Sequence, residues 1–334
     1  MRKKFLFSPL FLLCKLVLIC YNIRMKQTQN NNVKKTVPTL RELNKQQSAG
    51  FCFSASALAS MLFSFLFVGI LSAVNYKGGT QPDWYLYCSF LLPQLAFVAV
   101  ALLAFLKIKV PVREVVGKPS VKYFLLAVAM QFGLLSLSQL NGWFVGVLEG
   151  IGYVPAPVVI PSTQGFGLVG ALFVVALLPA IMEEVIFRGF LMRGLRGFGS
   201  VASILLCGAL FSLYHQNPVQ TAYQFCCGVA FALIALRSGS VLPTVLAHFL
   251  NNAVIVLYYH ITGSDSMPVP LWLTIVAGVC LAATFVYLLV FDKKPKNPSL
   301  IATEEPTKTD KKGFFFYAAV GLVVCFANWL GALV

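Results

Sequence analysis

Charged side chains are scarce in this chain. Only 11% of its 334 residues are Asp, Glu, Lys or Arg, whereas 58% are apolar and the mean hydropathy is +0.81. A soluble globular chain carries about 25% charged residues. This shortage excludes a soluble enzyme with a polar surface and predicts an all-α, polytopic bundle of transmembrane helices.

The cysteines follow no metal-binding or disulfide pattern. Nine are present, all within or beside apolar runs, and none forms a Cys-x-x-Cys pair. Thiols in apolar helices behave as small apolar residues. We therefore predict neither a disulfide framework nor a cysteine metal site.

Signatures of three intramembrane protease classes are also missing. The sequence has no His-Glu-x-x-His, which excludes a zincin-like site. No Asp falls inside an apolar run, which excludes an aspartyl pair, and residues 197–200 read Gly-Phe-Gly-Ser rather than Gly-x-Ser-Gly. A catalytic site must therefore use other residues.

The apolar runs are long enough to cross a membrane. A spanning helix needs about 20 apolar residues. Several runs are short, so we expect eight to nine spans. The candidates are 51–75, 85–106, 123–146, 166–187, 199–215, 219–236, 241–260, 270–291 and 313–334.

The net charge of +15 is better explained by topology than by nucleic-acid binding. If residues 1–50 are cytoplasmic and the spans alternate, 25 of the 26 Lys and Arg residues fall on the cytoplasmic side and Lys77 alone falls outside. Cytoplasmic loops of membrane proteins collect basic residues in this way. We predict a cytoplasmic N-terminus, membrane lipid as a partner and no nucleic acid.

Composition divides the chain into four parts. Residues 1–50 form a partly disordered cytoplasmic segment, 51–291 the bundle, 292–312 a cytoplasmic linker and 313–334 a C-terminal transmembrane helix. Within the first part, whether residues 1–24 belong to the native protein stays open, because Met25 is an alternative start.

Two adjacent carboxylates interrupt an apolar run. Glu183 and Glu184 follow the apolar stretch that begins at Gly165, and they are the only acidic residues well placed to be buried. A charge at the bilayer centre costs about 3 kcal/mol on insertion scales. Such a pair indicates chemistry or transport.

Helical spacing separates the two carboxylates. Glu184 lies four residues before Arg188, the favoured order for an ion pair on one helix face. Glu183 lies about 100° around the helix and has no local partner. Glu183 is therefore the candidate general base, and Glu184 the structural partner of Arg188.

Two histidines lie in nearby apolar runs. His215 and His248 become candidate members of one site because an unpaired carboxylate accompanies them. Asn252 is four residues after His248 and shares its face. We interpret Asn251 as a bystander and His260 as a core residue at the outer end of its span.

Three motifs together resemble the CPBP family, the CAAX-protease and bacteriocin-processing group also called the ABI family. The resemblance covers about residues 165–260. Its motifs are Glu-Glu-x-x-x-Arg, Phe-x-x-x-His and His-x-x-x-Asn, which stand here as Glu183-Glu184-Val-Ile-Phe-Arg188, Phe211-Ser-Leu-Tyr-His215 and His248-Phe-Leu-Asn-Asn252.

The resemblance implies an intramembrane endopeptidase acting on a lipidated or hydrophobic peptide. Glu183 would activate water with His215, while His248 and Asn252 would stabilise the oxyanion. The alternative is a metalloprotease in which Glu183, His215 and His248 bind Zn²⁺. Supporting roles fall to Glu184, Arg188 and Phe211.

Two other functions stay open. One is a non-catalytic bacteriocin-immunity or scaffold protein that keeps the pocket and acts by binding. The other is a proton-coupled transporter, since buried Glu and His also serve as proton relays. The resemblance favours a bacterial cell membrane, and the sequence leaves the oligomeric state unknown.

The depths of the candidate residues conflict in this topology. His215 lies more than about 20 Å from the cytoplasmic end of its span, whereas Glu183 is near the end of the 166–187 span. We expect the helix to continue past Arg188, through Gly189 to Arg196, so that Glu183 lies deeper.

Overall fold

The computed structural model describes residues 40–264, 267–292 and 307–333. It divides into two compact units, Met1–Glu42 and Leu43–Val334. The fold below is that of the second unit, because most of the first lies outside the described residues. So do most of the predicted linker at 292–312 and the predicted extension at 1–24.

The described residues form helices and no strands. Eight of these helices are long and apolar enough to cross a membrane, which confirms the all-α bundle of an integral membrane protein. The predicted 199–215 span is instead a shorter apolar helix. The eight are Lys45–Ala73, Asp83–Ile108, Val121–Gly150, Gly167–Phe198, Pro218–Ser238, Leu242–Thr262, Leu271–Phe291 and Thr309–Leu333.

The first span begins earlier than predicted. Helix α2 (Lys45–Ala73) starts at a capping box, in which Asn44 accepts a hydrogen bond from the Gln47 N–H and the Gln47 side chain bonds back to the Asn44 N–H. A capping box satisfies two of the N–H groups left free at a helix start. Residues 45–50, which the sequence assigned to the N-terminal segment, are therefore the first turns of this helix.

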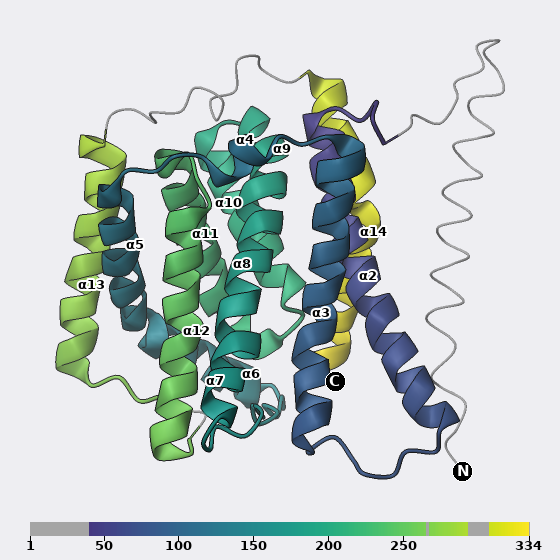
Figure 1. Ribbon diagram of the computed structural model, residues 1–334. Coiled ribbons are helices and arrows are strands. Elements are labelled where there is room, and N and C mark those ends of the chain that lie inside the picture. Colours follow the sequence, from purple (N-terminus) through teal and green to yellow (C-terminus); the bar gives the residue numbers. More distant parts are fainter. Residues whose placement is uncertain (1–39, 265–266, 293–306, 334) are drawn as a thin grey trace. The chain divides into compact units, whose positions relative to one another are not determined.

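The last helix lies beside the first. Helix α14 (Lys308–Leu333) runs along α2 (Figure 1). Helix α3 (Asp83–Leu103), which the π segment η1 (Ala104–Ile108) extends, also packs on α2. The Gly321 N–H donates to the Ser54 hydroxyl at 3.0 Å, which requires close backbones. Small residues allow such close approach between membrane helices.

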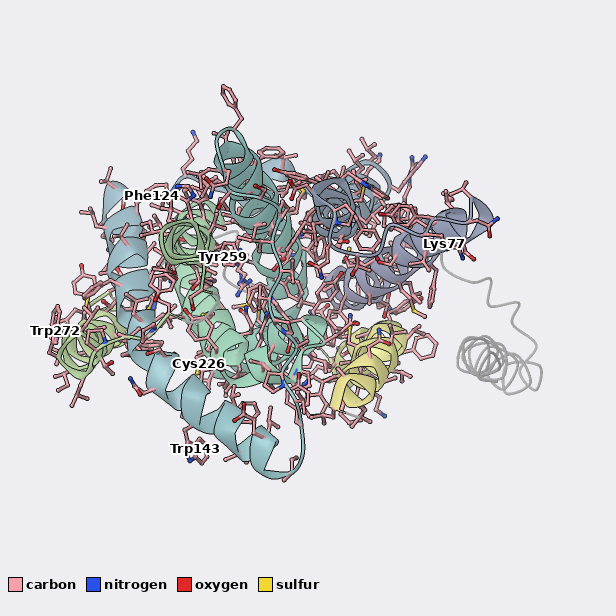
Figure 2. The ribbon with its side chains drawn as sticks, turned by 90° about the horizontal axis from the view of Figure 1, so that it is seen from below. Lys77, Phe124, Trp143, Cys226, Tyr259 and Trp272 are labelled. Atoms are coloured by element: carbon pink, nitrogen blue, oxygen red, sulfur yellow. The ribbon has the colours of Figure 1, made fainter. Side chains whose placement is uncertain are left out.

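At the other side of the bundle, α5 (Val121–Leu134) lies beside α13 (Leu271–Val286) (Figure 1). The 3₁₀ turn η2 (Leu135–Leu137) joins α5 to α6 (Ser138–Gly150), and the π segment η7 (Tyr287–Phe291) extends α13. Figure 2 shows Trp143 of α6 and Trp272 of α13 at the outside of the bundle, where both are exposed. These outward faces are apolar, as a lipid environment requires.

A continuous 32-residue rod, Gly167–Phe198, crosses the middle of the bundle. Its winding changes repeatedly between α, π and 3₁₀ turns. In order these are α7 (Gly167–Ala171), η3 (Leu172–Leu177), α8 (Leu178–Glu184), η4 (Val185–Leu191), α9 (Met192–Leu195) and η5 (Arg196–Phe198), with η3 and η4 the π segments.

Three helices follow the rod: α10 (Ser200–Tyr214), α11 (Thr221–Ser238) after the 3₁₀ turn η6 (Pro218–Gln220), and α12 (Leu242–Thr262). A short helix, α4 (Val112–Val116), bonds to the start of α12: the Val241 N–H donates to the Val115 carbonyl at 3.3 Å.

Asp292 is a buried acidic residue that the sequence did not predict. Asp292 is buried, with 4% of its surface exposed, so the prediction that Glu183 and Glu184 are the only buried acidic residues is wrong. Its carboxylate accepts from Lys122 at 2.6 Å and Tyr123 at 2.9 Å, and Arg237 donates to its carbonyl at 2.7 Å. The two donors from α5 explain why this carboxylate tolerates burial, and Arg237 holds the backbone of the same residue.

The α10–α11 crossing depends on glycine. A Cβ placed on Gly228 would lie 2.7 Å from the Cα and 3.0 Å from the carbonyl oxygen of Gly208. Both neighbours are backbone atoms, so relief requires the helices to separate. We expect Gly228→Ala to lower the free energy of unfolding by about 1–3 kcal/mol, as overpacking does.

Gly146→Ala on α6 is the matched control. Nothing lies within 4 Å of the added Cβ, and alanine favours a helix over glycine by about 0.5–1 kcal/mol. Thermal unfolding of the two purified variants in one detergent should separate them. Equal melting temperatures would contradict the close crossing.

Candidate active site

Irregular winding surrounds the two carboxylates. Helix α8 carries Glu183 and Glu184 between two π segments, η3 and η4. π turns inside α-helices are frequent at functional sites. Such turns change the direction of the side chains that follow them. They also leave backbone groups that need hydrogen-bond partners from other residues.

Pro179 leaves one such backbone group, the Val175 carbonyl, without its usual donor. It has no N–H, so it cannot bond the carbonyl of Val175 four residues earlier. The Asn252 side chain on α12 donates to that carbonyl at 3.2 Å instead. The proline therefore joins the rod to α12, next to the site.

The predicted extension of the rod past Arg188 is confirmed, and the conflict of depths disappears. Glu183 lies 15 residues before the end of the rod at Phe198, and His215 lies 15 residues after the start of α10 at Ser200. At 1.5 Å per residue, each is about 22 Å from the shared turn at Gly199. The two side chains are therefore at the same level.

Glu184 and Arg188 form the predicted ion pair. Arg188 Nη1 donates to Glu184 Oε1 at 2.8 Å, and both side chains have 0% exposure. His248 Nδ1 lies 2.9 Å from the same carboxylate oxygen. Arg188 Nη2 also donates to the Gly228 carbonyl at 3.3 Å, so this one cation connects the rod to α11 and, through Glu184, to α12.

Phe211 packs at the centre of these groups. The Arg188 guanidinium lies 4.2 Å from the Phe211 ring centroid, a cation–π arrangement. The rings of His215 and His248 lie 4.7 and 5.9 Å from it, both edge-on. Phe211 thus separates the two histidines and fixes the plane of each.

Glu183 faces His215. Glu183 Oε2 and His215 Nε2 are 4.0 Å apart, and the side chains are 12% and 18% exposed. His215 Nδ1 lies 2.8 Å from the Phe211 carbonyl, which only accepts hydrogen bonds, so Nδ1 carries the proton. In neutral His215, Nε2 therefore presents a lone pair towards Glu183.

These two residues line a cavity of about 580 Å³. Its other walls come from α2, α3, the turn at Tyr214 to Gln216, and Asn328 of α14. Of the predicted site residues, all of which are described, Glu183 and His215 line this cavity and His248 and Asn252 do not. The structure therefore places Glu183 and His215 at the cavity and His248 and Asn252 outside its lining.

Asn251 is more than the predicted bystander. It is buried, and its Oδ1 accepts from Gln131 Nε2 at 2.9 Å and from the Tyr223 hydroxyl at 2.7 Å. Its Nδ2 donates to Asn252 Oδ1 at 3.0 Å. This fixes the Asn252 amide with its nitrogen towards Val175, a positioning role that the sequence alone did not reveal.

The proposed zinc ligands do not converge. Among the described residues, no group of three or more His, Cys, Asp or Glu side chains is placed to hold a metal ion. Hydrogen bonds hold the Nδ1 atoms of His248 and His215 at Glu184 and at the Phe211 carbonyl, so only their Nε2 atoms are available to a metal. Glu183, His215 and His248 therefore do not fit a zinc site in this arrangement.

Gln94 on α3 is a further residue that the sequence analysis missed. It is 5% exposed, lines the cavity, and its Oε1 has no hydrogen-bond partner among the described residues. A signal was present, because a Gln directly after Pro93 inside a predicted span is a polar residue in an apolar run.

Residues 165–254 match the family model described as Type II CAAX prenyl endopeptidase Rce1-like. The region is similar to the Rce1-like family. No curated protein and no solved structure matches the chain. The match confirms the resemblance to the CAAX-protease group, and the family suggests endopeptidase activity.

The Rce1-like region holds all seven predicted site residues, from Glu183 to Asn252. It does not include α2, α3 or α14, which supply most of the cavity wall. The likeness to the Rce1-like family therefore covers the catalytic candidates, and the surfaces that would meet a substrate lie largely outside it.

The buried ion pair makes a strong stability prediction. Arg188→Met would leave the buried Glu184 without its arginine and with only the His248 contact, and we expect a loss of about 3–5 kcal/mol in the free energy of unfolding. The double variant Glu184→Gln/Arg188→Met removes both charges and should recover part of that loss. Denaturant unfolding in mixed micelles would measure both.

Arg193→Met is the control for this experiment. Arg193 pairs with Glu114 at 2.8 Å, but the two side chains are 20% and 26% exposed. Partly exposed pairs contribute about 0–1 kcal/mol. A loss at Arg193 as large as that at Arg188 would contradict the special role of the buried pair.

Proposed function

We propose that this protein is an intramembrane endopeptidase that hydrolyses a peptide bond in a lipidated or hydrophobic peptide. The observation that carries the proposal is the Glu183–His215 pair at the wall of a cavity, 4.0 Å apart and level with each other. The Rce1-like match at residues 165–254 supports the same reaction class.

In the proposed mechanism Glu183 is the general base. Its free Oε2 accepts a proton from a water that also hydrogen-bonds to His215 Nε2, and the water oxygen attacks the scissile carbonyl. The C–N bond then breaks, and Glu183 returns the proton to the departing amine. The Phe211 carbonyl holds the His215 ring in the required tautomer.

His248 and Asn252 are the proposed oxyanion donors. His248 Nδ1 faces the Glu184 carboxylate, so the other ring nitrogen, Nε2, is the atom proposed to meet the oxyanion. Asn252 uses one amide hydrogen on the Val175 carbonyl and keeps the other. His248 is buried, where a hydrogen bond to developing charge is strongest, and Asn252 is partly buried beside it.

The orientation of the chain belongs to the same proposal. A cytoplasmic N-terminus, in a bacterial membrane, would place Gly199 and the basic ends of the rod and α11 on the cytoplasmic side. The site would then lie about 22 Å from that side along the rod. Membrane lipid is the surrounding partner.

Glu183→Gln tests the catalytic proposal. It preserves the shape of the side chain and removes the base, so we expect cleavage of a farnesylated Cys-aliphatic-aliphatic-X peptide to fall by about 10²–10⁴-fold. Liposome-reconstituted protein and mass spectrometry of the products would measure it. Gln139→Met, on α6 and away from the cavity, is the control.

Two outcomes would contradict the proposal. Equal cleavage by wild type and Glu183→Gln would exclude Glu183 as the base. Full cellular function of Glu183→Gln, without cleavage by either protein, would instead favour the scaffold or immunity role. A parallel assay after chelation and zinc readdition tests metal dependence separately, with bound zinc measured by mass spectrometry.

A further inference from the structure

Gln94 is a buried amide with an unused acceptor at the cavity wall. It lies on α3, outside the Rce1-like region, and lines the same cavity as Glu183. Only 5% of the surface of Gln94 is exposed, yet its Oε1 has no hydrogen-bond partner among the described residues. An unpaired buried acceptor is unfavourable, because it has lost its hydrogen bonds to water without gaining a partner.

Two neighbouring polar residues of the cavity, Tyr214 and Gln216, already have hydrogen-bond partners. The Tyr214 hydroxyl lies 2.8 Å from the Ser60 hydroxyl and donates to the Ser56 carbonyl at 3.2 Å. Gln216 Oε1 accepts from Asn328 Nδ2 at 2.6 Å. Gln94 differs from these groups because its acceptor is left over, and a ligand that donates a hydrogen bond would recover the cost.

The same wall offers a second acceptor. Pro93 has no N–H with which to bond the carbonyl of Ser89 four residues earlier, and both residues line the cavity. At Pro179 the corresponding carbonyl is bonded by Asn252. Pro93 thus leaves the Ser89 carbonyl without its usual donor, in a residue that lines the same cavity as Gln94.

A peptide backbone supplies the donors that these acceptors require. A lipid chain has no hydrogen-bond donor, so the acceptors cannot serve it. A peptide that is unwound for cleavage exposes N–H groups, and each unpaired one costs several kcal/mol inside the membrane. Acceptors on the wall remove that cost next to the catalytic carboxylate.

We propose that Gln94, together with the Ser89 carbonyl, binds backbone N–H groups of an unwound substrate peptide beside the scissile bond. Gln94 is then a substrate-positioning residue that selects for an extended peptide segment. The inference rests on the proposed endopeptidase function, which places a peptide in this cavity.

The test measures peptide binding without cleavage. In a Glu183→Gln background in nanodiscs, the dissociation constants of two labelled probes are measured: a farnesylated Cys-aliphatic-aliphatic-X peptide and an apolar 20-residue peptide. Gln94→Met keeps the length of the side chain and removes the acceptor. We expect it to weaken binding of at least one probe about five- to tenfold.

Ester substitution identifies the donor. Each backbone N–H of the bound probe is replaced in turn by an ester oxygen, and one position should weaken binding by the same factor. At that position Gln94→Met should cause no further loss, since both changes remove one hydrogen bond. Gln139 lies at the start of α6, donates to the Val269 carbonyl and does not line the cavity, so Gln139→Met should leave the whole series unchanged.

Stability separates positioning from a structural role. Because Gln94→Met removes an unsatisfied buried acceptor, its melting temperature should equal or exceed that of the parent. Unchanged affinity, additive losses at every ester position, or a lowered melting temperature with no change in affinity would each overturn the inference while leaving Glu183-dependent cleavage intact. Binding of neither probe, with no cleavage by wild type, would instead reject the endopeptidase proposal itself.

Discussion

Glu184 and Arg188 carry opposite charges in the middle of a bundle that is otherwise apolar, and neither is exposed. Burying either charge alone would cost several kcal/mol, so the two must stay together. Their pairing connects three helices, because Arg188 also bonds to the Gly228 carbonyl and Glu184 also binds His248. With this interaction in place, Glu183 on the adjacent face is left free to meet His215.

Irregular backbone beside the site is the second constraint. π turns flank the carboxylates, and prolines interrupt both the rod and α3. Inside a membrane, freed backbone groups need partners from protein. Asn252 bonds to the Val175 carbonyl that Pro179 cannot reach, whereas on α3, beside Pro93, the Gln94 Oε1 atom has no partner among the described residues.

Local pattern was sufficient for the class of the protein and for pairs within one helix. Charge scarcity and run length predicted the bundle, and four-residue spacing predicted the Glu184–Arg188 pair. Contacts between helices were beyond such patterns. Asp292 was assigned to the 292–312 linker, because its donors Lys122, Tyr123 and Arg237 are far from it in the sequence. Asn251 was interpreted as a bystander for the same reason, since Gln131 and Tyr223 bond to it from other helices.

The sequence alone determined that two carboxylates share a membrane helix, that only one has a partner within helical reach, and that three motifs accompany them. Helical periodicity is local, so it can be read from spacing. Only the tertiary structure decided that Glu183 and His215 are level at one cavity while His248 lies behind it on Glu184. Those placements depend on where each helix begins in depth and on which close crossings its glycines allow, and both are set by packing between segments far apart in the chain.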